Sequence, residues 1–322
     1  MSNADIIEHI NKLTDLIFPE AIKWRRQIHA HPEIGFKELK TSELIFNVLE
    51  QQGLQPKIIA KTGVVAVIEG KIAGPTIALR ADIDALPIIE EADIECKSQL
   101  HGVMHACGHD AHAAILLGVA KVLGELRHLL AGKIKLIFQP SEEVPPGGAL
   151  PMIDEGVLKD PDVDAIFALH VNPHYPAGVI GIKEGVMMAA ADVFELKIIG
   201  AGGHGAAPHQ TIDPIIIAAQ LINALQTIGS RLVNPTEPVV VTIGRISGGT
   251  THNVIPNTVD LKGTCRSLNN ETRRKLHHSL ERLTKAIVDG YGASYQLNYH
   301  YGYPPVINHK HMAEIVRRAG RN

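Results

Sequence analysis

Residues 111–139 read AHAAILLGVAKVLGELRHLLAGKIKLIFQ and carry the strongest signal for the fold class. Apolar residues recur at helical spacing over residues 111–130, and a short apolar run typical of a buried strand follows over residues 133–139. Similar strand-like runs occupy residues 64–69, 76–80 and 165–170. Because strands that alternate with helices form layers, we predict an α/β fold with a mixed, largely parallel sheet and flanking helices.

The segment before the first strand is predicted to be helical. Apolar residues recur at helical spacing in two stretches within residues 5–50, and Gly53 closes the second stretch. The segment KIAGP, residues 71–75, has the composition of a turn and is expected to separate the strands at 64–69 and 76–80.

The pattern changes in the second half of the chain, where the order of expected elements becomes βαββαβ. Asp213 before Pro214 is a good helix start, because Asp caps helices and Pro suits the first helical position. This order is typical of a ferredoxin-like unit. We therefore predict two domains, residues 1–186 with 297–322, and an insert at residues 187–296.

Composition excludes several function classes. The 322 residues include 31 Lys and Arg against 34 Asp and Glu, so the chain has no basic excess with which to bind nucleic acid. The longest apolar run, residues 113–120, is far shorter than the roughly 20 residues that span a bilayer, so no membrane partner is expected. The N-terminal segment lacks the pattern of a signal peptide, and three cysteines cannot all pair within the chain. These features predict a cytoplasmic protein.

Histidine is unusually frequent, with 18 residues, and reactive side chains follow the predicted strands of the first domain. These side chains are Asp82 and Asp84 after residues 76–80, Glu142 and Glu143 after residues 133–139, and His170 at the end of residues 165–170. Open α/β sheets bind ligands beyond the carboxyl ends of their strands. The sequence therefore predicts that these groups converge on one site.

Cys107 and His109 flank Gly108 just before the long helix. In an extended loop, residues two apart point the same way, so both side chains could bind one metal ion. Asp110 could cap a helix that begins at Ala111. The alternative is a buried cysteine beside a capping motif. The neighbouring His101, His105 and His112 are expected to be structural or to support the ligands.

Adjacent Glu142 and Glu143 would point in opposite directions in an extended segment, so one could bind metal while the other takes a proton from water. Taken alone, a Glu pair is more often a solvated surface feature, and His170 is more often a core histidine. Their joint occurrence at strand ends favours a metal centre.

The insert contains GAGGHG at residues 200–205, which fits a dinucleotide-binding pattern. Pro208 and Pro214 delay the following helix, so we interpret the segment as a glycine-rich turn that displays His204. His209, Asn253 and Arg266 are further polar candidates in the same insert, although Arg266 could also form only a surface ion pair.

Eight segments carry a resemblance that runs nearly from end to end: HAHPEIGFKE, LRADIDALP, GVMHACGHDAHAA, FQPSEE, ALHVNP, GAGGHGAAPH, HNVIPN and GTCRS. The sequence resembles the amidohydrolase branch of the metallopeptidase family that includes carboxypeptidase G, aminoacylase, hippurate hydrolase and plant indole-acetyl-amino-acid hydrolases. The resemblance implies a zinc-exopeptidase-like catalytic domain and an inserted lid and dimerisation domain. It also implies a dinuclear metal site.

The resemblance assigns roles to individual residues. The metal ligands it implies are Cys107, His109, Glu143 and His170. It implies that Glu142 is the catalytic glutamate, that Asp84 orients the site, and that Asp82 occupies the place of a metal-binding His. His204 resembles a lid histidine that reaches the partner subunit's active site and stabilises the oxyanion, and Asn253 and Arg266 resemble contacts to the substrate carboxylate.

The function implied is hydrolysis of the amide bond of small N-acyl amino acids by two divalent ions, zinc, manganese, nickel or cobalt, in a homodimer. Such ions activate water when about 3.5–4 Å apart. The alternatives are a dipeptidase or carboxypeptidase with the same site, and a non-catalytic metal-binding remnant. The family's last metal-binding His lies in a C-terminal segment without a counterpart before Asn322, while His309 and His311 are interpreted as the start of a surface helix. Weak binding of the second metal and impaired activity are therefore expected.

Overall fold

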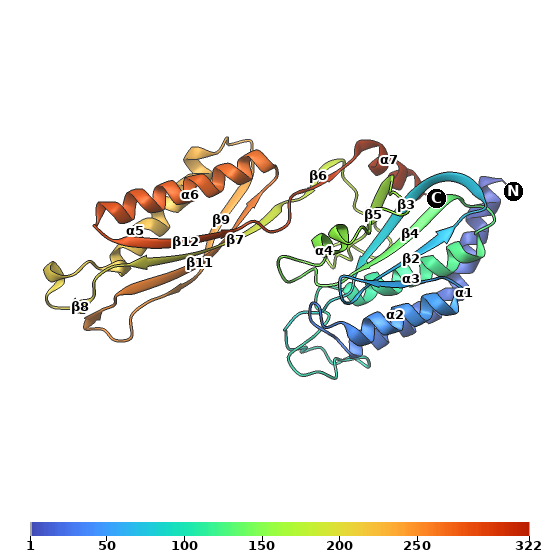
Figure 1. The fold of residues 1–322 in the computed structure, drawn as a ribbon, viewed down its shortest axis with the longest axis horizontal. Helices are drawn as coiled ribbons and strands as arrows, with labels where there is room; N and C mark the ends of the chain where they lie inside the picture. The colour runs from blue at the N-terminus through green and yellow to red at the C-terminus, as the bar shows by residue number, and fades with distance from the viewer. Residues whose placement is uncertain (1, 322) are drawn as a thin grey trace. The chain divides into compact units, whose positions relative to one another are not determined.

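The structure is a computed structural model that describes residues 2–321 (Figure 1). The chain forms two compact units, Met1–Val179 and Ile180–Asn322, which we call unit 1 and unit 2. The predicted domain boundaries, at residues 187 and 296, stay a prediction.

Unit 1 contains a five-stranded mixed sheet in the order β1-β2-β4-β3-β5. Its strands are β1 (Lys57–Ile59), β2 (Gly63–Glu69), β3 (Ile72–Asp82), β4 (Ala131–Gln139) and β5 (Ala165–Ala168). β3 runs parallel to both β4 and β5, whereas β1, β2 and β4 pair antiparallel. The predicted α/β class with a mixed sheet is confirmed, and its parallel part comprises the three strands that precede the reactive side chains.

The prediction of a turn at residues 71–75 is wrong, because β3 already begins at Ile72. Ile72 pairs with Ala131 of β4, and the register shifts before Thr76. Pro75 lies within this irregular stretch, where the missing backbone N–H of proline does not interrupt a regular ladder. The composition of a turn here marks a bulge in a long strand.

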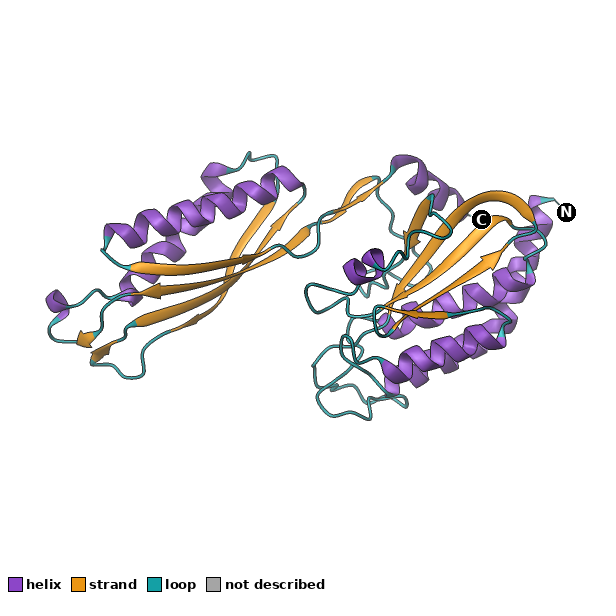
Figure 2. Ribbon diagram, viewed as in Figure 1, coloured by secondary structure: helices purple, strands orange, loops and turns teal. Residues whose placement is uncertain are grey.

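Helices cover both faces of this sheet (Figure 2). They are α1 (Asn3–Ala30), α2 (Leu39–Gln51), α3 (His109–Glu125) and α4 (Ala149–Asp154). Successive residues of a strand face opposite sides. Leu136 and Phe138 of β4 therefore lie in the large core beneath α1, α2 and α3, whereas Ile137 contributes to a smaller core with Met152 of α4. Burial of both faces explains the nearly continuous apolar run in β4.

Unit 2 contains a four-stranded antiparallel sheet in the order β12-β7-β11-β9. In chain order its main elements are β7 (Ala190–Ile199), α5 (Pro214–Thr227), β9 (Val239–Ser247), β11 (Thr258–Ser267), α6 (Asn270–Gly290) and β12 (Ser294–His300). This is the predicted βαββαβ order. Smaller elements complete the unit: β6 (Gly185–Met188), β8 (Gly203–His204), β10 (Val254–Ile255), β13 (Val306–Asn308) and α7 (Lys310–Ala319).

Helix α5 starts as the sequence predicts, because the Asp213 side chain accepts a hydrogen bond from the Ile215 N–H at 2.8 Å. With the π-helical turn that follows it, α5 forms Pro214–Leu232, the one helical segment of residues 2–321 that is long and apolar enough to cross a membrane. One face of the segment, including Leu221 and Leu225, lies in the core of unit 2. Since core helices pass the same test, the segment is weak evidence for a membrane span.

Candidate metal centre

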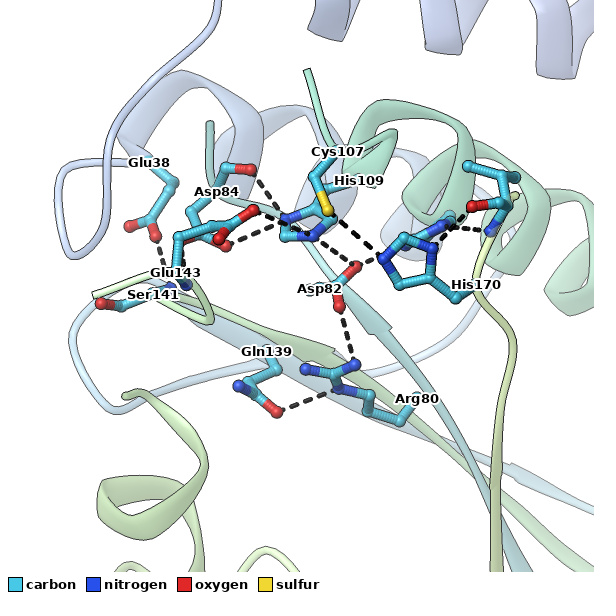
Figure 3. A network of polar contacts seen from close by, with 12 residues as sticks. Glu38, Arg80, Asp82, Asp84, Cys107, His109, Gln139, Ser141, Glu143 and His170 are labelled. Atoms are coloured by element: carbon cyan, nitrogen blue, oxygen red, sulfur yellow. Dashed lines mark hydrogen bonds and ion pairs between the residues drawn. The ribbon is translucent and has the colours of Figure 1, made fainter. Parts of the chain in front are cut away.

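The polar side chains expected at a metal centre gather where three parallel strands of unit 1 end (Figure 3). Parallel strands place their carboxyl ends together, so the segments after β3, β4 and β5 start at one edge of the sheet. Three groups have potential ligand atoms within 4.8 Å of one another: Cys107 with His109 and His170, Asp82 with His109 and His112, and His109 with Glu142 and Glu143.

A left-handed turn at Gly108 brings Cys107 and His109 together. Helix α3 begins at His109, two residues earlier than predicted, and Gly108 has a φ angle of 92°. A Cβ atom on Gly108 would lie 2.3 Å from Cγ2 of Val171, so both the backbone and the contact require glycine. The expected extended loop through His109 is therefore wrong. Asp110 does not cap the helix, because it lies within the first turn of α3, and its Oδ2 contacts Arg25 and His29 of α1.

Cys107 and His170 form a thiol–imidazole pair. Sγ of Cys107 lies 3.3 Å from Nε2 of His170, and Nδ1 of that ring donates to the Val171 carbonyl oxygen at 2.7 Å. The neighbouring His109 and His170 rings lower the pKa of the Cys107 thiol, and the hydrogen bond with Cys107 raises the pKa of His170 to about 9. A thiolate and an imidazole nitrogen are ligands that zinc binds well.

His109 and Glu143 present two buried atoms to each other without a hydrogen bond between them. Nδ1 of His109 donates to the carbonyl oxygen of Asp84 at 2.9 Å and lies 3.1 Å from its Oδ1, so the neutral form of this ring has its lone pair on Nε2. That Nε2 lies 3.9 Å from Oε1 of Glu143, and neither atom has a hydrogen-bond partner among residues 2–321. Buried polar atoms are almost always partnered, so this pair fits a cation between the two atoms.

Asp84 contacts both of these potential ligands. Its Oδ2 accepts the backbone N–H of Glu143 at 3.0 Å, in addition to the contact between its Oδ1 and His109. Its side chain is buried. A buried carboxylate that fixes the ring orientation of a ligand histidine is a common supporting feature of metal sites.

Asp82 has both carboxylate oxygens in use. Oδ2 accepts from Arg80 at 2.7 Å, and Oδ1 accepts from Nδ1 of His112 at 2.6 Å. Nε2 of His112 accepts the Val171 N–H at 2.9 Å, so both nitrogens of this ring are also occupied. Burial raises the pKa of Asp82, but the His112 hydrogen bond and the Arg80 charge outweigh burial and hold the pKa well below its usual range.

Glu142 and Glu143 lie in a bent segment after β4 and not in an extended one. Carboxylate oxygens of both residues lie within 4.8 Å of each other and of a His109 ring nitrogen, so the prediction of opposite directions is wrong. Burial raises the pKa of Glu142, and the negative charges of Asp82 and Glu143 raise it further. A carboxylate with a raised pKa beside potential metal ligands has the properties of a general base.

In unit 2, His204 and Asn253 lie side by side. β8 pairs with β10, and the Gly205 N–H donates to the Asn253 carbonyl oxygen at 2.8 Å. Nδ1 of His204 accepts the Ala206 N–H at 3.0 Å, so the proton of the neutral ring resides on Nε2. Because the His204 side chain is exposed, it offers an N–H donor to a ligand.

Arg266 lies in β11, near the end of the four-stranded sheet that is remote from His204 and Asn253. Thr258, at the start of β11, pairs with Ile199 at the end of β7, whereas Arg266 lies eight residues further along β11. At about 3.3 Å per residue, this separation is about 26 Å. His204 follows the end of β7 and Asn253 precedes the start of β11, so unit 2 does not bring Arg266 together with these two residues.

Two contributors to this region escaped the sequence analysis. Arg80 binds Asp82, and Glu38 accepts the Ser141 N–H at 2.8 Å. A charge inside the apolar strand segment TIALR is a signal for Arg80, because a charge in a buried strand requires a partner. Glu38 lies in an irregular segment between two helices, and its one signal is that it ends the HAHPEIGFKE segment of the family resemblance. His309 and His311 are exposed at the start of α7, as predicted.

An α/β sheet with thiol, imidazole and carboxylate groups gathered at one edge, beside a second carboxylate, has the architecture of a metal-dependent hydrolase. The chain belongs to peptidase family M20/M25/M40, whose sequence profile matches residues 78–322. Membership confirms the family resemblance, the fold class and the expectation of an enzyme that hydrolyses linear amides. The ligand groups and the family together indicate two divalent metal ions.

Individual relatives cover most of the chain. An N-acyl-L-amino acid amidohydrolase of Geobacillus stearothermophilus is 46% identical over 94% of this chain and 81% of its own length. Among solved structures, a putative aminohydrolase from methicillin-resistant Staphylococcus aureus has a TM-score of 0.91 at 37% identity, covering 97% of this chain and 83% of that one. The Bacillus subtilis YXEP protein, described as a dinuclear metal binding peptidase, has a TM-score of 0.81 at 38% identity, covering 95% and 80%.

Proposed function

We propose that this protein is a metal-dependent amidohydrolase that cleaves the amide bond of N-acyl amino acids. The observation that carries the proposal is the pair of buried atoms, Nε2 of His109 and Oε1 of Glu143, which face each other at 3.9 Å beside Glu142. The activity named for the Geobacillus stearothermophilus relative supports this substrate class.

Four residues are proposed to hold the two divalent ions: Cys107, His109, Glu143 and His170. Their thiol, imidazole and carboxylate groups suit zinc, and imidazole with carboxylate also accommodates manganese, nickel or cobalt. When bound, such ions polarise an amide carbonyl and lower the pKa of water. Asp84 would keep His109 and Glu143 in their binding orientations through the contacts already described.

Glu142 is proposed as the general base. Its carboxylate takes a proton from the attacking water as the new C–O bond forms at the acyl carbon. The protonated Glu142 then gives this proton to the leaving amine as the C–N bond breaks, which restores the carboxylate. Its raised pKa supports the role, because proton transfer in both directions is easiest when the pKa lies near the working pH.

His204, Asn253 and Arg266 are proposed to bind the substrate from unit 2. The Nε2–H of His204 suits the negative charge that develops on the carbonyl oxygen, and Asn253 and Arg266 would bind the free carboxylate. An N-acyl amino acid spans about two residue lengths, about 7 Å, which is much less than the 26 Å of strand between the ends of unit 2. If a small substrate contacts both Arg266 and His204, these two residues must therefore belong to two different chains.

This argument requires a homodimer, which we propose to form through unit 2. Strand β9 lies at the edge of its sheet, and its exposed residues include Val240 and Ile246. Such an edge presents unpaired backbone groups that a second copy can extend across a two-fold axis. Helix α5, which exposes Ile215 and Ile216, is the other candidate contact.

The free cysteines Cys96, Cys107 and Cys265 support the proposal of a cytoplasmic enzyme with a small-molecule substrate.

One experiment tests the proposal directly. The purified chain is loaded with zinc, manganese or cobalt, its metal content is measured by elemental analysis, and it is assayed with hippurate, acetyl amino acids and dipeptides. We expect bound metal and faster turnover of N-acyl amino acids than of dipeptides. Preference for dipeptides would identify a peptidase instead, and metal content near zero without turnover would identify a non-catalytic remnant.

A further inference from the structure

Glu38 is a completely buried acid that belongs to none of the potential ligand groups. Its Oε1 accepts the backbone N–H of Ser141 at 2.8 Å (Figure 3). Its Oε2 accepts the Thr62 hydroxyl at 2.7 Å. A buried carboxyl group is costly unless its oxygens are hydrogen-bonded. The contacts of Glu38 thus account for its burial, and they direct attention to the backbone that it binds.

Ser141 has an unusual backbone conformation. Its φ angle is 46°, in the left-handed region that residues other than glycine rarely adopt. Such a conformation persists only where the surroundings hold it. Glu38 binds the Ser141 N–H, and the Gly148 N–H donates to the Ser141 carbonyl oxygen at 2.9 Å. Gly35 leaves room for the side chain, because a Cβ there would lie 2.5 Å from Oγ of Ser141.

Ser141 directly precedes the two glutamates of the candidate metal centre. Glu142 is the next residue, so the backbone angles of Ser141 set the direction in which its side chain leaves the chain. Glu143 has its own anchor, because its N–H donates to Asp84. Release of Ser141 should therefore change the direction in which the Glu142 side chain leaves the backbone, whereas the Asp84 contact continues to hold the backbone of Glu143.

We propose that Glu38 is a positioning residue for the reaction: its carboxyl group holds Ser141 in the left-handed conformation that aims Glu142 at the substrate. This inference rests on the proposed function, in which Glu142 is the base. It adds a residue from the segment between α1 and α2 whose side-chain hydrogen bonds go to Thr62 and Ser141.

Substitutions at Glu38 separate hydrogen bonding from burial. Glu38→Met removes the acceptor for Ser141 and preserves the length of the side chain. Glu38→Gln keeps an oxygen for the Ser141 N–H and turns an amide N–H toward the Thr62 hydroxyl, which can accept it. Thr62→Val is the matched control, because it removes the other hydrogen bond of Glu38 without touching Ser141.

The first readout is hippurate hydrolysis by the zinc-loaded chain. We expect Glu38→Met to lower kcat at least tenfold with KM and zinc content within twofold of wild type, whereas Glu38→Gln and Thr62→Val keep kcat within about threefold. Glu38→Asp, which withdraws the carboxyl by one methylene, provides the same test if the methionine variant does not fold. A loss of kcat accompanied by an equal loss of zinc, or found equally in Glu38→Gln, would overturn the positioning role.

The second readout does not depend on activity. Pro140–Ser141 is the only Pro–Ser pair in the sequence, so carbonyl-¹³C proline with ¹⁵N serine gives one NMR signal, the Ser141 amide. Its hydrogen exchange should be at least tenfold faster in Glu38→Met than in wild type or Glu38→Gln. Unchanged exchange would overturn the inference. Absence of hydrolysis by metal-loaded wild type would instead refute the proposed function, while the exchange measurement would still decide whether Glu38 holds Ser141.

Discussion

Replacing Glu142 by Gln tests the central assignment of the site. Glutamine keeps the shape of the side chain but cannot accept a proton from water, so the general-base contribution is lost. Such a contribution is typically 10²–10⁴-fold in rate, which corresponds to about 2.7–5.4 kcal/mol of barrier at 1.36 kcal/mol per tenfold. We expect kcat for hippurate to fall by this factor while the metal content of the protein stays near that of wild type.

Glu143→Gln is the matched variant in the adjacent residue. Oε1 of Glu143 is buried opposite Nε2 of His109 at 3.9 Å, so loss of its charge removes an anionic ligand from a site that otherwise lacks partners. Metal content after gel filtration should therefore fall, with activity partly restored by excess metal. If Glu142→Gln lost the metal and Glu143→Gln kept it, the division of roles between the two residues would be wrong.

The metal-free protein supplies a second measurement on Glu142→Gln. Burial, assisted by the charges of Asp82 and Glu143, raises the pKa of Glu142 above 4.5, so the folded state favours the protonated form. Protonation of Glu142 therefore contributes to the free energy of unfolding of the wild type. This contribution is complete below pH 4.5 and is lost as the pH rises through the raised pKa. Glu142→Gln does not titrate, so its thermal midpoint should exceed that of wild type at pH 7, and this advantage should shrink below pH 4.5. Equal midpoints at pH 7 would contradict this reasoning.

Three further predictions follow from contacts in the two units. Asp84→Asn should weaken zinc binding about 10–100-fold in a competition assay, because the carboxylate orients two potential ligands; unchanged affinity would remove that role. The His29 ring lies 2.8 Å from the Asp110 carboxylate and 3.0 Å from the Glu90 carboxylate. The hydrogen bond with Asp110 is the main cause that raises the pKa of His29. Its stabilisation is therefore present below pH 6.5 and lost as the pH rises through the raised pKa, so His29→Asn should flatten urea stability measured between pH 6 and 9. Mixing Glu142→Gln chains with His204→Ala chains should restore about a quarter of wild-type activity, since half of the dimers would be mixed and each would hold one intact site. No recovery despite demonstrated exchange of chains would count against action in trans.

The sequence predicts the location of the site because that location depends on strands. Apolar runs at residues 133–139 and 165–170 locate the ends of β4 and β5 within two residues, and reactive side chains follow directly. Because these strands are parallel, their ends lie together whatever the conformation of the loops. For the same reason, the assignment of Glu142 and Glu143 to the metal centre needs only the order of elements in the chain.

The directions of the side chains depend on turns, and there the sequence was insufficient. The expectation of an extended segment at Cys107 and His109 missed the left-handed turn at Gly108, although both side chains still meet. At Glu142 the same assumption predicted divergence, whereas the bent segment brings both carboxylates to His109. A glycine signals a positive φ angle, but a serine does not, so the conformation of Ser141 has no local sequence signal.

The conformation of Ser141 follows from contacts that are distant in sequence. Glu38 lies 103 residues before the serine that it binds, and Gly35 provides the space for the serine side chain. Strand ends therefore determine which residues reach the centre, while buried polar contacts from other segments determine how those residues are aimed. A left-handed serine is unfavourable by itself. Removal of the Glu38 contact should therefore change the direction of the Glu142 side chain before it changes which residues lie at the metal centre. Catalytic rate, and not metal content, is thus the quantity in which such contacts become visible.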